Sequence, residues 1–213
     1  MPLKLGFIDW NGTLIDDFWL IYEATAEPFR TFGLEPPPPE VYREEIESNR
    51  PKFYQDYGMP AHRLEEARAI KRRVIMARWP ETKLRDDAVE TFRACRDLGL
   101  KLAIVSGEDP TILYQQLNRF GIRRFFDYVR GGAWPKERAF IEAITLFGLR
   151  PEEAFAVEDL GVAIEMAKLV DLTTFGLVNG HSTRARITAA EPNFVIETLS
   201  EIPPIVARIN QGR

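Results

Sequence analysis

Polar side chains of the types used in phosphoryl transfer follow several short apolar runs of the chain. They are Asp9, Ser106, Lys136 and the pair Glu158-Asp159. An aspartate can attack phosphorus and form an aspartyl-phosphate. Phosphoryl transfer otherwise depends on positioning and on positive charge around the transferred group. These residue types therefore indicate a phosphoryl-transfer site, provided that the fold brings them together.

The chemistry of each side chain suggests a role in such a site. Asp9 and Asp159 could hold Mg²⁺, which prefers a few carboxylates, waters and the phosphate oxygens of the substrate. Lys136 would neutralise the phosphate and keep Asp9 ionised, and Ser106 would donate a hydrogen bond to a phosphoryl oxygen. Taken singly, Ser106 and the acidic pair also fit helix caps, and Lys136 fits a solvated helix start. The occurrence of all these residues in this order, at the ends of successive strands, favours a phosphoryl-transfer site over separate structural roles.

Alternating strand and helix patterns provide the elements that would position these residues. The expected strands are 3–8, 101–105, 128–129, 154–157, 172–178 and 194–196, and the expected helices are 86–98, 110–120, 136–147, 160–169 and a last one that ends at Asn210. Such alternation is typical of an α/β fold with a parallel sheet and right-handed crossovers. Ligands of these sheets bind at the carboxyl ends of the strands, where the polar residues stand.

The segment between the first strand and residue 81 has only helical patterns. Helices are expected at 16–32, which ends at Gly33, at 41–48 and at 62–79. A proline-rich loop (35–40) and the stretch 50–54 separate them. The sequence therefore predicts an α/β core from residues 1–15 and 81–213, with an all-helical cap, residues 16–80, inserted after the first strand.

The dipeptide Asn11-Gly12 leaves a second interpretation of the N-terminal segment open. Asn-Gly between two apolar runs is a strong hairpin signal, so 5–10 could pair with 13–18. The apolar residues beyond it recur at helical spacing, which would leave the second strand only a few residues. A parallel strand followed by a turn and a helix is the favoured interpretation.

These motifs together resemble those of the haloacid dehalogenase superfamily. Asp9-Trp10-Asn11-Gly12-Thr13-Leu14 is similar to its first motif, Asp-x-Asp-Gly-Thr-Leu. Ser106 after an apolar strand resembles the second motif, and Lys136 the third. The sequence 156–164 is similar to the fourth, in the Glu-Asp form of the phosphoglycolate phosphatase and β-phosphoglucomutase group, and the helical insert matches that group's cap. The resemblance covers essentially the whole chain and implies a Rossmann-like sheet with a cap that closes over the site.

The resemblance also implies roles in catalysis and metal binding. Asp9 would be the nucleophile and a Mg²⁺ ligand, and the backbone carbonyl of Asn11 would be a second ligand. Asp159, with Glu158, would complete the metal site. The implied activity is that of a magnesium-dependent hydrolase, a phosphatase acting on a small phosphorylated metabolite.

Substrate binding would involve both parts of the chain. Ser106, Gly107 and Lys136 would hold the phosphoryl group. In the insert, Arg50 and Lys52 are candidates to meet an anionic substrate, although a solvated surface is the commoner role for such residues. The sequence does not rank the insert residues further.

Asn11 departs from the family pattern, which has a second aspartate at this position. That aspartate protonates the leaving oxygen and later activates water, whereas an amide cannot exchange a proton near neutral pH. General acid–base catalysis contributes about 10²–10⁴ in rate, or roughly 3–5 kcal/mol. Metal binding should survive, because it uses the backbone carbonyl.

Three functions remain open because of Asn11. The first is a hydrolase with slow turnover, favouring leaving groups that need no proton, such as acyl phosphates. The second is a protein on the same scaffold that binds or senses a phosphorylated ligand. The third is phosphonate cleavage, in which Lys52 would form a Schiff base. A further hypothesis is deamidation of Asn11-Gly12 to Asp-Gly, which would restore the motif unless the folded loop prevents it.

Composition narrows the remaining possibilities. The 213 residues have a net charge of −4, so nothing in the charge favours binding to nucleic acid or to an anionic membrane. No leader pattern or membrane-spanning run is present, and the single cysteine, Cys95, cannot form an internal disulfide. A cytoplasmic location is therefore expected.

Two other classes of active site find no support in the sequence. Ser106 lies in Val-Ser-Gly-Glu, which differs from the Gly-x-Ser-x-Gly motif of serine hydrolases, and no Cys/His cluster suggests zinc. The sequence does not indicate an oligomeric state.

Overall fold

The computed structural model describes residues 1–45 and 50–212, and in it the chain forms two compact units. One unit, the core unit, consists of Met1–Asp16 and Leu84–Arg213. The other, the insert unit, is Asp17–Lys83. The domain boundaries expected from the sequence, a core of residues 1–15 and 81–213 and a cap of residues 16–80, stay a prediction.

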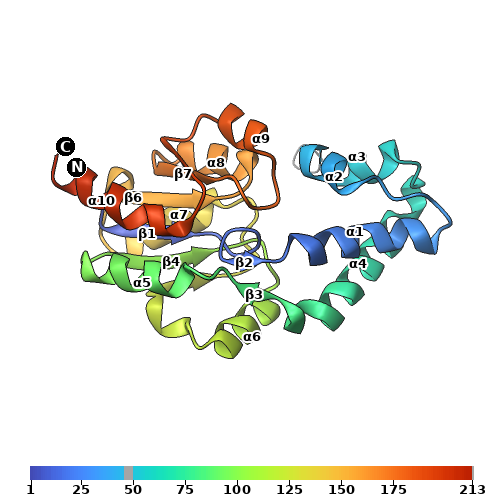
Figure 1. Ribbon diagram of the computed structural model, residues 1–213, viewed down its shortest axis with the longest axis horizontal. Helices are drawn as coiled ribbons and strands as arrows, with labels where there is room; N and C mark the ends of the chain where they lie inside the picture. The colour runs from blue at the N-terminus through green and yellow to red at the C-terminus, as the bar shows by residue number, and fades with distance from the viewer. Residues whose placement is uncertain (46–49, 213) are drawn as a thin grey trace. The chain divides into compact units, whose positions relative to one another are not determined.

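Six parallel strands form the sheet of the core unit, in the order β5-β4-β1-β6-β7-β8 (Figure 1). Their bounds are β1 (Leu5–Ile8), β4 (Lys101–Val105), β5 (Tyr128–Arg130), β6 (Ala154–Glu158), β7 (Thr173–Leu177) and β8 (Phe194–Ile196). Strand β1 lies between β4 and β6, with Ile8 opposite Ile104 on one side and Val157 on the other. The residues just beyond these three strands therefore emerge at one edge of the sheet.

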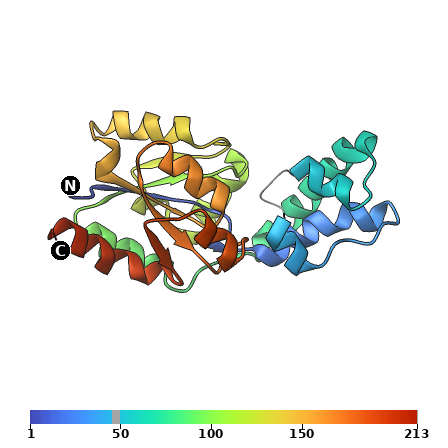
Figure 2. The same cartoon turned by 90° about the horizontal axis from the view of Figure 1, so that it is seen from above.

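Helices cover both faces of this sheet, as Figure 2 shows. Their bounds are α5 (Ala88–Asp97), α6 (Pro110–Phe120), α7 (Glu137–Leu146), α8 (Gly161–Lys168), α9 (Arg184–Ala189) and α10 (Ile202–Asn210). Side chains of β1 alternate between the faces: Ile8 packs with apolar residues of α5, α6 and α10, whereas Phe7 packs with residues of α7 and α8. Cys95 is buried in the first of these clusters. Burial on both faces explains why the central strands β1, β4 and β6 consist mostly of apolar residues.

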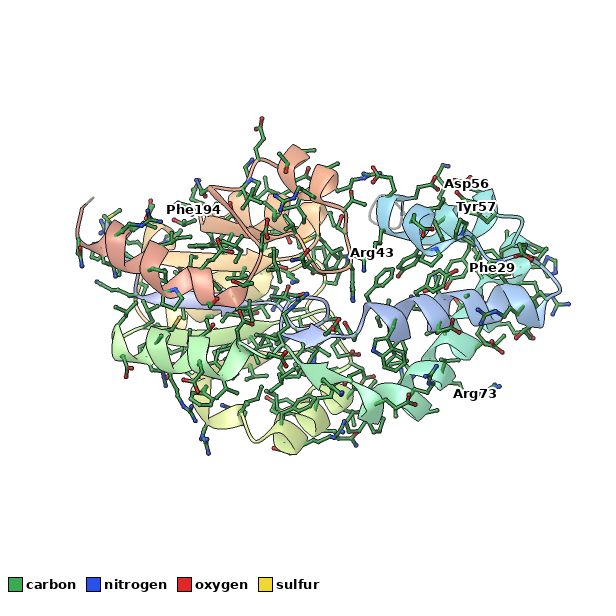
Figure 3. The ribbon with its side chains drawn as sticks, viewed as in Figure 1. Phe29, Arg43, Asp56, Tyr57, Arg73 and Phe194 are labelled. Carbon is green, nitrogen blue, oxygen red and sulfur yellow. The ribbon has the colours of Figure 1, made fainter. Side chains whose placement is uncertain are left out.

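The insert unit is helical, with α1 (Phe18–Thr31), α2 (Pro39–Glu45), α3 (Arg50–Asp56) and α4 (Leu64–Arg78). Aromatic rings fill its interior: Phe29, which is labelled in Figure 3, stacks on Tyr54 with ring centroids 5.4 Å apart. Such pairs contribute beyond the area that they bury. Two short strands, β2 (Ile15–Asp16) and β3 (Lys83–Leu84), pair with each other where the chain passes between the units. The insert is thus stabilised by its own apolar cluster, separate from the sheet's.

Short 3-10 turns complete the secondary structure: η1 (Ala61–Arg63), η2 (Trp79–Glu81), η3 (Arg123–Phe125), η4 (Pro151–Glu153) and η5 (Leu199–Glu201). No helix in the described ranges 1–45 and 50–212 has the length and apolar character needed to cross a membrane.

The structure confirms the parallel α/β sheet with a helical insert after β1 and excludes the hairpin interpretation. Asn11 and Ile15 form only an isolated bridge within the turn, while β1 pairs with β4 and β6.

Several finer expectations were wrong. The stretch 50–54 is helical, because α3 buries Phe53 and Tyr54 in the aromatic cluster and a proline is tolerated in a first helical turn. The helix expected at 41–48 begins earlier, at Pro39, and is described as far as Glu45; its expected end, Ser48, lies outside the described residues. Neither α9 nor the β2–β3 pair was expected.

Glu153 ties the entry of β1 to the turn before β6. It accepts hydrogen bonds from Lys4 Nζ (2.6 Å) and from the backbone N–H of Arg150 (3.0 Å). The bond from Lys4, with that from Arg150, lowers the pKa of Glu153 from 4.5 to about 2. The folded state therefore releases this proton more readily than the unfolded state does. The resulting stability is present above about pH 4.5 and is lost as the pH falls towards 2.

We expect Glu153→Gln to lower the urea midpoint of unfolding near neutral pH and to differ much less from wild type near pH 2, where about half of the wild-type Glu153 side chains are protonated even in the folded state. Urea titrations at both pH values measure this difference. The neighbouring exposed residue provides the control, since Glu152→Gln should leave the midpoint unchanged. An equal loss for Glu153→Gln at both pH values would contradict the assignment.

Candidate active site

Lys136 lies between two carboxylates at the carboxyl edge of the sheet. Its Nζ donates to Asp9 Oδ1 and to Glu158 Oε2, both at 2.6 Å. Lys136, Glu158 and Asp159 are at most 2% exposed, and Asp9 is 7% exposed. The structure therefore brings together the polar residues at the ends of β1 and β6 with the residue that precedes α7.

The loops after β4 and β5 hold Lys136 in this place. The backbone N–H of Ala133 donates to the carbonyl of Ser106 (2.8 Å), and that of Gly132 donates to the carbonyl of Glu108 (2.7 Å). Gly132 has φ +64°, a conformation that favours glycine. Lys136 then enters the site from the N-cap position of α7, where the sequence had suggested the first helical residue.

Ser106 and Gly107 follow β4 at the same edge. Ser106 is buried, and its Oγ accepts the backbone N–H of Glu108 (3.1 Å), a bond that leaves the hydroxyl proton available for donation to a ligand. Gly107 is exposed. Their predicted contact with a phosphoryl group stays a prediction that this position supports.

Asp159 is held by the loop after β7, which the sequence analysis did not identify. Its Oδ2 accepts the backbone N–H of His181 (2.6 Å), and its Oδ1 accepts the Thr13 hydroxyl (3.4 Å). The backbone comes so close that a Cβ on Gly12 would lie 1.9 Å from Asp159 Oδ2, and one on Gly180 would lie 2.3 Å from it. Glycine is therefore required at both positions, although only Gly12 belongs to a recognisable motif.

Arg85 is a second residue that the sequence analysis missed. Its guanidinium donates to the carbonyls of Gly12 (2.6 Å) and Thr13 (2.9 Å) and to that of Asn179 (2.7 Å). It thereby joins the turn after β1 to the loop that holds Asp159. Its bonds are to backbone carbonyls, so no side-chain pattern in the sequence signals them.

Asn11 is half-buried in the turn after β1, and its Nδ2 donates to Glu108 Oε2 at 3.1 Å. The backbone N–H of Gly12, which would attack the side chain in deamidation, donates to the carbonyl of Ile15 (3.0 Å). Both groups are thus engaged in the folded turn, which disfavours deamidation. The indole of Trp10 is buried and donates to Gln116 of α6 (2.6 Å), which anchors the same turn.

Burial and charge shift the pKa values of this cluster. Burial raises the pKa of Asp159 to about 6, with a further increase from the Asp9 charge, while His181 opposes both. Burial likewise raises the pKa of Glu158 above the ordinary range, although Lys136 acts in the opposite direction. Burial alone would lower the pKa of Lys136, but the Asp9 and Glu158 charges raise it, so this side chain stays protonated. The cluster has three carboxyl groups for one ammonium, and burial raises the pKa of two of them.

The excess of buried carboxylates and the oxygen-only donor set fit a divalent cation such as Mg²⁺. Within residues 1–45 and 50–212, no three Asp, Glu, His or Cys side chains are arranged to hold a metal by themselves. A site built from two carboxylates and the Asn11 carbonyl, completed by waters and substrate, is consistent with that finding. Lys136 is bonded to Asp9 and to Glu158 at the same distance, so these bonds do not rank the carboxylates. The ligand set Asp9, Asn11, Glu158 and Asp159 stays a prediction.

The two insert residues predicted to bind substrate are not described equally well. Lys52 is exposed and forms an ion pair with Asp56 on its own helix. Arg50 begins α3, but its side chain lies outside the described part of the structure. Their roles stay predictions.

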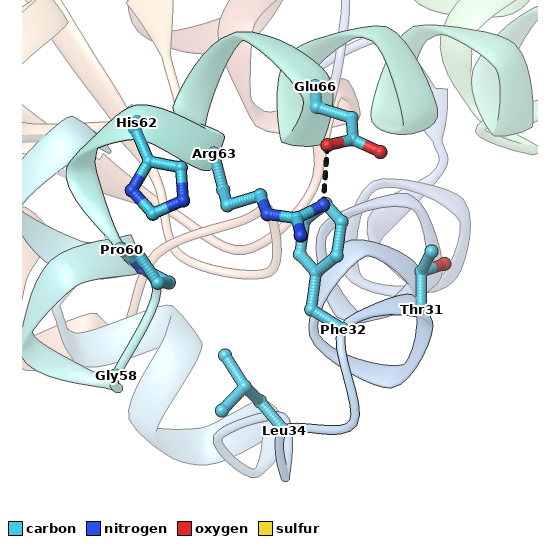
Figure 4. A pocket seen from close by; sticks show the side chains of 8 residues that line it. All are labelled: Thr31, Phe32, Leu34, Gly58, Pro60, His62, Arg63 and Glu66. Atoms are coloured by element: carbon cyan, nitrogen blue, oxygen red, sulfur yellow. Dashed lines mark hydrogen bonds and ion pairs between the residues drawn. The ribbon is translucent and has the colours of Figure 1, made fainter.

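A pocket of about 520 Å³ lies within the insert unit (Figure 4). Arg63 crosses it, over the ring of Phe32 at 4.8 Å, and pairs with Glu66 at 2.9 Å. Leu34, Pro60 and His62 also line it. None of the predicted site residues is among its lining residues, and Arg63 is already neutralised by Glu66.

The chain is similar over most of its length to hydrolases and phosphatases of known families. Residues 3–171 match the family model of haloacid dehalogenase-like hydrolases. Phosphoglycolate phosphatase of Vibrio vulnificus (strain YJ016) is 24% identical in an alignment of 220 positions that covers 96% of this chain and 96% of that protein. Glyceraldehyde 3-phosphate phosphatase of Methanopyrus kandleri is 26% identical in an alignment of 229 positions that covers 97% of this chain and 98% of that protein.

Solved structures show the same fold. A haloacid dehalogenase-like hydrolase from Streptococcus pneumoniae superimposes with a TM-score of 0.85 at 19% identity, covering 95% of this chain and 98% of its own. A haloacid dehalogenase-like protein from Agrobacterium tumefaciens gives 0.80 at 20% identity, covering 97% and 99%. The fold expected from the sequence is thus confirmed.

Proposed function

The chain belongs to the haloacid dehalogenase-like hydrolase family, and we propose that it is a Mg²⁺-dependent phosphatase that acts on a small phosphorylated metabolite through Asp9. The observation that carries this proposal is the buried bridge from Lys136 to Asp9 and Glu158. It places a permanent positive charge against the nucleophilic carboxylate, where the charge of a transferred phosphoryl group would have to be balanced.

In the proposed reaction, Asp9 Oδ attacks phosphorus and the bond to the leaving oxygen breaks, giving an aspartyl-phosphate that water then hydrolyses. Lys136 keeps Asp9 ionised and balances phosphoryl charge, while Ser106 donates to a phosphoryl oxygen. Glu158 orients Lys136 through its 2.6 Å bond. A bound Mg²⁺ would supply further charge neutralisation for the phosphoryl oxygens. Asp9, Asp159 and the Asn11 carbonyl are the groups proposed to hold it.

The proposed substrates are small phosphate monoesters. Relatives that span nearly the whole chain have phosphoglycolate or glyceraldehyde 3-phosphate in their names, which makes these two compounds the first to test. At identities of 24–26%, the names guide the choice of panel and do not select one substrate.

Binding without turnover is the second candidate function, and Asn11 is the observation that favours it. Its amide occupies the position of the family's acid–base aspartate and cannot give or take a proton. Phosphonate cleavage through Lys52 has less support, because a Schiff-base lysine is usually desolvated or set beside another cation, whereas Lys52 is exposed and paired with Asp56.

Phosphate release from a panel of phosphate esters and acyl phosphates tests the proposal. We expect Mg²⁺-dependent release by freshly purified wild-type protein, abolished by chelation and restored by added Mg²⁺. Asn11→Asp is the informative variant. A silent wild type beside an active Asn11→Asp protein would instead support binding without turnover, because it would show an intact scaffold that lacks only the acid–base group.

A further inference from the structure

We propose that Glu108 is the general acid and general base of this site and supplies the carboxylate that Asn11 lacks. The inference rests on the proposed function, because it assigns a residue to the aspartyl-phosphate reaction at Asp9. It starts from a contact between two segments that are 97 residues apart in the chain.

The carboxylate of Glu108 is fixed directly beside the Asn11 amide. Its Oε2 accepts Asn11 Nδ2 at 3.1 Å, and its Oε1 accepts the backbone N–H of Asp109 at 2.8 Å. The backbone is held as well, by the bond to Ser106 Oγ (3.1 Å) and by the N–H of Gly132 (2.7 Å). The side chain is half-buried, so it is positioned by the site and still reached by water.

The hydrogen bonds described for the other carboxylates of the site join them to residues other than Asn11. Asp9 and Glu158 accept from Lys136, and Asp159 accepts from His181 and Thr13. Glu108 is bonded to the one residue whose position calls for a proton-exchanging group. In this proposal, the Glu108 carboxylate acts on the leaving oxygen and on the attacking water in place of a side chain at position 11.

Atoms and charges balance over the two proposed steps. Asp9 Oδ forms a bond to phosphorus while the ester P–O bond breaks, and protonated Glu108 gives its proton to the departing alkoxide. Glu108, now a carboxylate, takes a proton from water as the water oxygen attacks the phosphorus of the aspartyl-phosphate. The bond from phosphorus to Asp9 breaks, and its electron pair returns to Asp9. The net reaction is ester plus water to alcohol plus phosphate, with Asp9 and Glu108 regenerated.

Glu108→Gln tests the assignment, because glutamine has nearly the same shape and its one carbonyl oxygen can still accept from either Asn11 or the backbone N–H of Asp109. We expect the kcat for an alkyl phosphate to fall by about 10²–10⁴-fold. An acyl phosphate needs no proton for its leaving group, so the variant should release one acyl group per chain rapidly and then turn over slowly. Phosphorylated protein should accumulate, as an intact mass increased by one phosphoryl group. A variant that is merely misfolded would give no such burst.

Two further variants sharpen the test. Glu165→Gln makes the same change at an exposed glutamate of α8 that has no part in the proposed reaction, and it should retain wild-type rates. The double variant Asn11→Asp with Glu108→Gln exchanges the two members of the hydrogen-bonded pair and places the carboxylate at position 11. We expect it to recover most of the alkyl phosphatase activity that Glu108→Gln loses.

The outcomes separate this inference from the proposed function. Wild-type rates in Glu108→Gln, with activity lost in Asp9→Asn, would overturn the role of Glu108 and leave the phosphatase standing. Loss of both the burst and steady turnover in Glu108→Gln, without recovery in the exchanged pair, would make Glu108 structural and also overturn the inference. Absence of Asp9-dependent phosphate release in the wild type would overturn both proposals.

Discussion

Asparagine in place of Asp9 is expected to reduce Mg²⁺-dependent phosphate release by at least about 10⁴-fold, because removal of a covalent nucleophile in other hydrolases has effects of that order or larger. The amide of asparagine is a poor nucleophile, whereas its shape matches that of aspartate. Its Oδ1 can still accept the hydrogen bond from Lys136, which keeps its second partner, Glu158. The fold should therefore survive while the reaction does not.

Two measurements separate loss of chemistry from loss of structure. The wild type, quenched in acid during turnover, should contain a phosphoryl group on the peptide that includes Asp9, and Asp9→Asn should contain none. Thermal unfolding should show a cooperative transition for both proteins. Asp97→Asn is the matched control, because it makes the same change on the exposed end of α5. Full activity of Asp9→Asn would remove the central premise of the proposed mechanism.

The main features of the fold were predictable because each central strand is an apolar run that ends at a polar residue. A strand buried on both faces must be apolar along its length. The register that sets Ile8 opposite Ile104 and Val157 then brings the polar residues at the ends of these strands to the same level. Asp9, Ser106 and the acidic pair could be placed at one edge by this reasoning alone. Lys136 was assigned to the same site from the order of the motifs along the chain.

The contacts that the sequence did not predict join residues far apart in the chain through single hydrogen bonds. Asn11 meets Glu108, and Asp159 meets the N–H of His181. Arg85 binds only backbone carbonyls. None of these bonds produces a periodic pattern, and a backbone donor or acceptor is present at almost every residue. Such contacts become visible only once the strand order is known.

The contacts of Lys136 indicate a second role for this residue that the sequence did not predict. The sequence suggested a phosphate-binding lysine beside Asp9, with Glu158 as a metal ligand. In the structure, Lys136 joins both carboxylates and is only 2% exposed. It is thus a structural group of the core as well as a proposed catalytic one, so its replacement should affect stability and activity together.

Methionine in place of Lys136 keeps most of the side-chain volume and removes the charge. Breaking a buried ion pair typically costs about 3–5 kcal/mol of unfolding free energy, because it leaves a buried charge without a partner. We expect a loss of that order for Lys136→Met in metal-free buffer, measured by urea unfolding with chelator present. Lys101→Met, at an exposed lysine at the start of β4, is the matched control and should change stability little.

The pH dependence of this loss has a definite sign. Burial already raises the pKa of Glu158, and Lys136 opposes that increase, so removing Lys136 raises the folded-state pKa further. In the folded variant, Glu158 then holds its proton more tightly than it does in the unfolded chain. This difference stabilises the folded state at low pH, and the stabilisation is lost as the pH rises. Lys136→Met should therefore lose less unfolding free energy near pH 5 than near pH 8.

Adding Glu158→Gln to Lys136→Met should recover part of the stability at the higher pH. It should recover none of the phosphatase activity, because the positive charge beside Asp9 is still missing. A loss of stability that did not change with pH would show that packing, and not the uncompensated carboxylates, governs the effect.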